Sequence, residues 1–178
     1  MRVIGGILGG RIFHPPLSRW PTRPTTDRAR EALFNILTNR FDFNTMSSLD
    51  LFAGTGANSL EALSRGCSDV TYVDKFRPAF SWFRKIVQEL ELQDHCTLYL
   101  TDVRKFIERS DRSYICVFAD PPYDLPWLKE IPELLFQHDL LEEGGSLIIE
   151  HGKDIEFSDH DRFERVRSYG QTRFSFFQ

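Results

Sequence analysis

The stretch Ser48-Leu49-Asp50-Leu51-Phe52-Ala53-Gly54-Thr55-Gly56 decides the fold. Residues 48–52 are typical of a buried strand, and residues 57–65 have helical periodicity that ends before a C-capping glycine. Gly54 and Gly56 allow a tight turn between strand and helix, and a close approach of the backbone to a ligand. The helix N-terminus adds free N–H groups and the positive end of the helix dipole. The stretch therefore predicts a strand–turn–helix unit that binds a ligand at its turn.

The turn differs from two common phosphate-binding motifs. Ser59 stands where the dinucleotide motif GxGxxG needs its third glycine, and the Gly-Lys-Ser/Thr of a P-loop does not follow. These departures favour a carboxylate or a small nucleoside over a pyrophosphate as the ligand.

Strand and helix patterns alternate over the rest of the chain. We expect further strands at residues 70–73, 97–100, 114–119 and 146–150. We expect helices starting near Pro78 and spanning residues 103–109 and 126–136. Residues 163–169 and 172–177, separated by Gly170-Gln171, predict an antiparallel hairpin. The fold class is α/β, with a doubly wound, Rossmann-like, mostly parallel sheet and an antiparallel C-terminal hairpin.

Positive charge is concentrated at the start of the chain. Residues 1–40 carry seven arginines and two acidic residues, a net charge of +5, whereas the whole chain has −4. This segment predicts an extended arm with a short hairpin, followed by a helix that starts at Thr26 or Asp27. The inner face of that helix is predicted to hold Ala29, Leu33, Ile36 and Leu37. We divide the chain into a basic arm, hairpin and helix (1–44) and a main domain (45–178). The arm indicates either a polyanionic partner or a solvated basic face.

The composition excludes several classes of protein. With 178 residues, 41% hydrophobic and 27% charged, the chain is long enough for one globular domain. Its three cysteines are widely spaced, which argues against a disulfide framework or a zinc site and favours a reducing, cytoplasmic location. The sequence contains neither the apolar run of about 20 residues that a membrane helix needs nor a typical signal peptide.

Acidic residues follow several of the predicted strands. Asp74 ends the second strand and Asp102 follows the third. Ligands of open α/β sheets bind outside the carboxyl ends of the strands. Asp74 could accept two ribose hydroxyls and Asp102 an exocyclic amine of adenine, although for either one alone a helix cap or a solvated loop is the more common role. Together with Asp120 after the fourth strand, they favour a nucleoside ligand.

The most specific motif is Asp120-Pro121-Pro122-Tyr123. The two prolines remove two N–H donors, so the turn presents mainly acceptors. The Asp120 carboxylate and a nearby carbonyl can together accept both hydrogens of an amino group. Tyr123 offers a ring on which a flipped base could stack. A rigid structural corner is the alternative interpretation.

With these motifs the chain resembles a known family. Residues 50–56 and 120–123 together resemble class I S-adenosylmethionine-dependent methyltransferases that methylate amino groups. Further matches at Arg2, Gly5-Gly6, Gly10-Arg11, 23–31, 33–35 and 60–66 resemble the RsmD family. That family methylates the exocyclic N2 of a guanine in small-subunit (16S) ribosomal RNA. Two departures are Ser59, where the family usually has Gly, and Asp74, where it often has Glu. Residues 151–178 match least well, and we predict no role for them.

The resemblance implies S-adenosylmethionine as cofactor and small-subunit ribosomal RNA as partner, free or in a partly assembled particle, with no membrane and no metal. Gly54 and Gly56 would flank the methionine portion of the cofactor, Asp74 would hold its ribose and Asp102 its adenine. The implied cofactor-binding residues are Asp50, Phe52, Gly54, Gly56, Asp74, Asp102 and Val103. The implied catalytic residues are Asp120, Pro121, Pro122 and Tyr123. The implied RNA-binding residues are Arg11, Arg23, Thr25, Arg28 and Arg30.

Two other functions stay open from the sequence. One is a DNA adenine-N6 methyltransferase, for which the same Asp-Pro-Pro-Tyr chemistry would serve, although the chain has little beyond the sheet pattern with which to read DNA. The other is a non-catalytic module that binds nucleoside and RNA; the intact residues 120–123 count against it.

Overall fold

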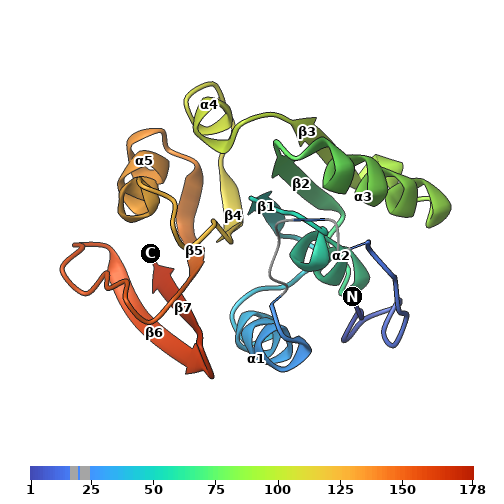
Figure 1. The fold of residues 1–178 in the computed structure, drawn as a ribbon, viewed down its shortest axis with the longest axis horizontal. Helices are drawn as coiled ribbons and strands as arrows, with labels where there is room; N and C mark the ends of the chain where they lie inside the picture. The colour runs from blue at the N-terminus through green and yellow to red at the C-terminus, as the bar shows by residue number, and fades with distance from the viewer. Residues whose placement is uncertain (17–19, 21–24) are drawn as a thin grey trace.

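A single mixed sheet organises the molecule (Figure 1). The computed structural model describes residues 1–16, 20 and 25–178, and within them seven strands follow the order β3-β2-β1-β4-β5-β7-β6. The strands are β1 (Ser47–Leu51), β2 (Asp69–Asp74), β3 (Cys96–Leu100), β4 (Tyr114–Ala119), β5 (Leu141–His151), β6 (Phe163–Tyr169) and β7 (Thr172–Phe177). β1 to β5 pair in parallel, and β7 pairs antiparallel with both β5 and β6. The predicted α/β class and C-terminal hairpin are confirmed.

The strand order reverses beside β1. From β1 the chain moves outward through β2 to β3, then returns to place β4 on the other side of β1. This reversal is the topological switch point, where open α/β sheets bind their ligands.

Helices cover both faces of the sheet (Figure 1). They are α1 (Asp27–Thr38), α2 (Ala57–Ser64), α3 (Arg77–Glu89), α4 (Val103–Ile107) and α5 (Ile131–Gln137), with short 3-10 turns at Gln93–His95 and Leu128–Glu130. Buried side chains of α1, α2 and α3 pack together with those of the N-terminal hairpin, whereas α4 and α5 pack on the opposite face. Among the described helices, none combines the length and apolar character of a membrane span.

The prediction of a helix over residues 126–136 is wrong about the residue at which the helix begins. The chain instead forms the 3-10 turn at Leu128–Glu130, and α5 begins at Ile131. Pro132 explains the boundary: it lacks an N–H group and so belongs in the first turn of a helix, whereas a helix from residue 126 would place it in the interior.

Helix α1 begins where the sequence predicts it. Thr26 caps the helix by accepting a hydrogen bond from the backbone N–H of Ala29. Its buried face includes Arg30, Phe34 and Leu37, whereas Ile36 is only half-buried. Three of the four residues predicted for this face are thus buried, and the face also carries an arginine.

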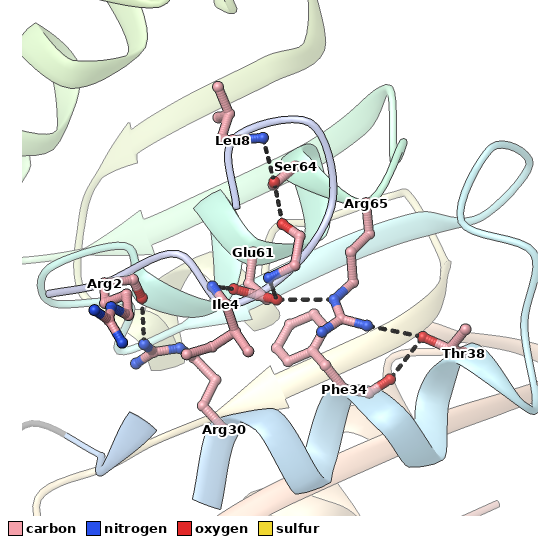
Figure 2. A network of polar contacts seen from close by, with 10 residues as sticks. Arg2, Ile4, Leu8, Arg30, Phe34, Thr38, Glu61, Ser64 and Arg65 are labelled. Atoms are coloured by element: carbon pink, nitrogen blue, oxygen red, sulfur yellow. Dashed lines mark hydrogen bonds and ion pairs between the residues drawn. The ribbon is translucent and has the colours of Figure 1, made fainter. Parts of the chain in front are cut away.

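The N-terminal hairpin (residues 2–12) is docked on α2 by a buried carboxylate (Figure 2). Glu61 is fully buried and accepts hydrogen bonds from the backbone N–H groups of Ile4 at 2.7 Å and Gly5 at 2.9 Å. The Arg65 guanidinium pairs with the same carboxylate at 2.8 Å and lies over the Phe34 ring of α1. One charged pair thus joins the hairpin, α1 and α2.

Candidate active site

A cleft of about 730 Å³ opens at the carboxyl ends of the central strands. Ends of β1, β2, β4 and β5 contribute to it, so it lies at the switch point that the topology defines. The residues named from the sequence that line the cleft are Thr25, Arg30, Asp50, Phe52, Gly54, Asp74, Asp102, Val103, Asp120, Pro121, Pro122 and Tyr123. Segments far apart in the sequence therefore meet around one space.

Asp50 is a buried carboxyl group at the base of the cleft. It is 1% exposed, and its Oδ2 accepts hydrogen bonds from the backbone N–H of Ser59 at 3.0 Å and the Ser59 hydroxyl at 2.6 Å. Within the described residues, Oδ1 has no hydrogen-bond partner. Burial raises the pKa of Asp50 to about 7, against the opposing effect of the two Ser59 hydrogen bonds. Ser59, the departure from the family pattern, therefore binds one oxygen of this carboxyl group.

The two glycines of the turn have different roles. Gly54 lines the cleft, and its backbone N–H donates to Asp74 Oδ2 at 2.7 Å. Gly56 is not among the lining residues; a Cβ there would lie 2.3 Å from the Phe83 ring. Its φ of +70° at the N-cap of α2 also favours glycine. Packing against α3 therefore requires glycine at position 56, and its expected place beside the ligand stays a prediction.

Phe52 lines the cleft in an uncommon backbone conformation. Its φ is +57°, in the left-handed region that non-glycine residues seldom adopt. Such strained conformations concentrate at functional sites. The centroids of the Phe52 and Trp127 rings are 5.8 Å apart.

Asp74 and Asp102 occupy the predicted strand ends. Asp74 accepts hydrogen bonds from Gly54 and from the backbone N–H of Phe76 at 2.7 Å, and burial raises its pKa. Asp102 caps α4 by accepting from the N–H groups of Arg104 and Lys105, so its helix-cap role is real. Both still line the cleft, and Val103 beside them is buried.

The Asp120–Tyr123 turn lines the side of the cleft opposite to Asp74 and Asp102. The Asp120 N–H donates to the Leu51 carbonyl at 3.2 Å, which ties the turn to the end of β1. Burial raises the pKa of Asp120 well above its usual range, and the negative charge of Glu150 adds to the shift. Tyr123 is 36% exposed, and a Cβ on Gly152 would lie 3.1 Å from its ring. The Gly152 backbone thus lies close to the Tyr123 ring.

Glu150, at the end of β5, is a site residue that the sequence predictions missed. It lines the cleft and is 6% exposed. The Tyr123 hydroxyl donates to its Oε1 at 3.2 Å, and the Thr25 hydroxyl donates to its Oε2 at 2.6 Å. A signal did exist, because Glu150 ends a predicted strand just as Asp74 does.

The predicted RNA-binding arginines separate into three cases. Arg11 and Arg28 are exposed. Arg30 is 2% exposed; its guanidinium donates to the Arg2 carbonyl at 2.5 Å and pairs with Asp27 at 2.8 Å, facing the cleft rather than the outer surface. Arg23 lies outside the described residues. Contact of Arg30 with an RNA backbone therefore does not fit its burial.

Comparison with known proteins agrees with this architecture. A family model described as "Conserved hypothetical protein 95" matches residues 1–178. YlbH of Bacillus subtilis is 35% identical over 159 residues, 88% of this chain and 85% of that protein. Ribosomal RNA small subunit methyltransferase D of Escherichia coli (strain K12) is 33% identical over 150 residues, 84% of this chain and 74% of that protein. The solved structure of yhhF from Escherichia coli has a TM-score of 0.87 at 29% identity, covering 100% of this chain and 97% of that one. The chain belongs to this family, the RsmD-type methyltransferases.

Proposed function

We propose that this protein transfers a methyl group from S-adenosylmethionine to the exocyclic N2 amine of a guanine in small-subunit ribosomal RNA. Its family supports an rRNA methyltransferase, and S-adenosylmethionine is the methyl donor. The observation that carries the guanine-amine proposal is the turn 120–123, an acceptor-rich corner that shares one cleft with the acidic ends of β1 and β2. A base held at this turn would lie next to a donor bound along those strands.

The volume and the buried carboxyl groups of the cleft fit a nucleoside cofactor that carries positive charge. The cleft volume lies within the range of roughly 300–1,000 Å³ that small-molecule sites have. The pKa values of Asp50 and Asp74 are both raised, chiefly by burial, so each carboxylate would be stabilised by a nearby cation. Asp50 Oδ1, buried and without a partner among the described residues, suits an ammonium group. We assign Asp50 to the ammonium of the cofactor, Asp74 to its ribose and the Asp102–Val103 corner to its adenine.

The chemistry follows from the acceptors of the turn. When bound, S-adenosylmethionine supplies a methyl group that its sulfonium already activates. The lone pair of a guanine amine is delocalised into the ring, which makes the amine a poor nucleophile. Asp120 and a carbonyl near Pro121 would accept its two hydrogens and favour a pyramidal nitrogen. Positive charge then develops on nitrogen, and the Asp120 carboxylate stabilises it before it or a water takes the proton.

Exposed arginines of the arm support an RNA substrate. Arg2, Arg11 and Arg28 lie on the surface, and guanidinium groups bind phosphates through two hydrogen bonds. Arg2 and Arg11 are carried by the hairpin that Glu61 fixes on α2 (Figure 2). A rigid hairpin can position these charges against an RNA backbone.

The activity test is nucleoside analysis after incubation with labelled S-adenosylmethionine. With small-subunit ribosomal RNA we expect labelled N2-methylguanosine. Labelled N6-methyladenine in DNA would instead identify a DNA methyltransferase. Absence of any labelled nucleoside, in RNA alone and in partly assembled particles, would favour a binding module.

Cofactor affinity should depend on pH through Asp50. Its pKa of about 7 means that the carboxyl group is ionised above pH 7 and protonated below it. If only the ionised form pairs with the ammonium group, affinity is full at pH 8 and about tenfold weaker at pH 6. Calorimetric titration with S-adenosylhomocysteine, which carries the same ammonium group, measures this. Asp50→Asn should bind weakly at both pH values; a wild-type affinity that is equal at pH 6 and pH 8 would contradict the assignment.

A further inference from the structure

A second carboxylate stands beside Asp120 on the acceptor side of the cleft. β4 and β5 pair in parallel with Ala119 opposite Ile149, so the next residues, Asp120 and Glu150, are neighbours across adjacent strands. Neighbouring strands are about 4.8 Å apart. Both side chains line the cleft, and the charge of Glu150 contributes to the raised pKa of Asp120. The turn therefore offers two closely spaced acidic groups.

Two hydroxyl groups orient the Glu150 carboxylate. Tyr123 donates to one oxygen and Thr25 to the other, and these residues come from the catalytic turn and from the segment that leads into α1. Carboxylate oxygens can each accept more than one hydrogen bond, so a donor on a ligand can join the contacts that Glu150 already makes. Because Tyr123 is the proposed stacking ring, Glu150 is held in a fixed relation to any base on that ring.

Two neighbouring carboxylates match one edge of guanine. That edge presents adjacent donors, the N1–H and the N2 amine, whereas the corresponding edge of adenine presents one amine and an N1 acceptor. A carboxylate opposite an acceptor leaves two lone pairs facing each other, and unpaired buried polar groups are costly. A pair of acids therefore favours guanine at a site where a single Asp would serve either base.

We propose that Glu150 accepts the N1–H of the target guanine while Asp120 holds its N2 amine, which makes Glu150 the residue that selects guanine. This inference rests on the proposed guanine-N2 activity and adds to it a residue that reads the base.

The test compares guanine with 2-aminopurine at the methylated position of a short small-subunit rRNA fragment. 2-Aminopurine keeps the 2-amine but has an acceptor at N1. Wild-type protein should prefer guanine in kcat/KM by about 10²-fold or more, because a site built to bind an N–H group rejects the analogue without it. In Glu150→Gln the amide can donate to the N1 acceptor, so the preference should fall at least tenfold, with slower transfer to guanine and unchanged or faster transfer to 2-aminopurine.

Glu143→Gln is the matched control, since Glu143 is an exposed residue at the other end of β5. It should keep the wild-type preference. Thermal unfolding and cofactor titration establish that each variant is folded, and a structural defect alone would slow both substrates equally. A preference in Glu150→Gln within threefold of wild type, with N2-methylguanosine still formed, would overturn this inference and leave the proposed function standing. Absence of N2-methylguanosine from wild-type reactions would overturn both.

Discussion

Replacing Asp120 by alanine should slow methyl transfer by about 10²–10³-fold, the usual cost of losing one electrostatic group that faces developing charge. The backbone N–H of Asp120 donates to the Leu51 carbonyl at the end of β1, which fixes the main chain that carries the carboxylate. Asp120→Asn keeps an acceptor oxygen without the charge, and its loss should be smaller. Single-turnover transfer at saturating cofactor and RNA measures the chemical step directly.

A control substitution of an exposed aspartate shows whether the loss of rate is specific to Asp120. Asp111 is exposed and lies before the start of β4, at the end of the strand remote from the cleft, so Asp111→Ala should retain wild-type rates. Cofactor affinity should change by no more than a few fold in Asp120→Ala, because the carboxylate faces the acceptor. A methyl-transfer rate of Asp120→Ala within a factor of about three of wild type would mean that residues 120–123 have only a structural role.

The fold was largely predictable because its strands are buried and its turns are sharply marked. Residues 114–119 and the hairpin over 163–177 agree with the sequence predictions at both ends. The prediction for the buried face of α1 omits Arg30, because a charged side chain does not indicate a buried position. Arg30 lies three, four and seven residues before Leu33, Phe34 and Leu37, a spacing that places it on the same face.

Site residues at strand ends were predictable from the sequence. Residues whose position depends on side-chain packing were harder to predict. Asp50, Asp74 and Asp120 line the cleft as their strand positions suggest. The spacing of Gly54 and Gly56 indicates a binding turn, whereas the packing of Gly56 depends on the ring of Phe83, 27 residues further along the chain. The contact between Thr25 and Glu150 spans 125 residues and depends on how the arm returns to the sheet. Local sequence patterns contain no information on such a pairing.

A buried carboxylate, Glu61, docks the N-terminal hairpin on α2, together with hydrogen bonds from Ile7 and Leu8 to Ser64. Glu61 is fully buried, accepts from two backbone N–H groups and pairs with Arg65, which is itself mostly buried. Arg65 also donates to the Thr38 hydroxyl at the end of α1 (Figure 2). Without the Glu61 carboxylate, two backbone donors and a guanidinium would lose their acceptor at once, in a place where water can replace it only if the hairpin separates from α2.

Glu61→Ala should therefore lower the free energy of unfolding by about 3–5 kcal/mol, the cost of breaking a buried ion pair by removing one partner. Urea unfolding followed by circular dichroism measures it. Glu31→Ala, on the exposed face of α1, should change stability by no more than about 0.5 kcal/mol. Hydrogen exchange adds a local measurement: in Glu61→Ala the amides of Ile4 and Gly5 should lose more protection than those of β4, because the hairpin opens before the sheet. A loss below about 1 kcal/mol with both amides still protected would mean that apolar packing of the hairpin, through Val3 and Leu8, holds it without the carboxylate.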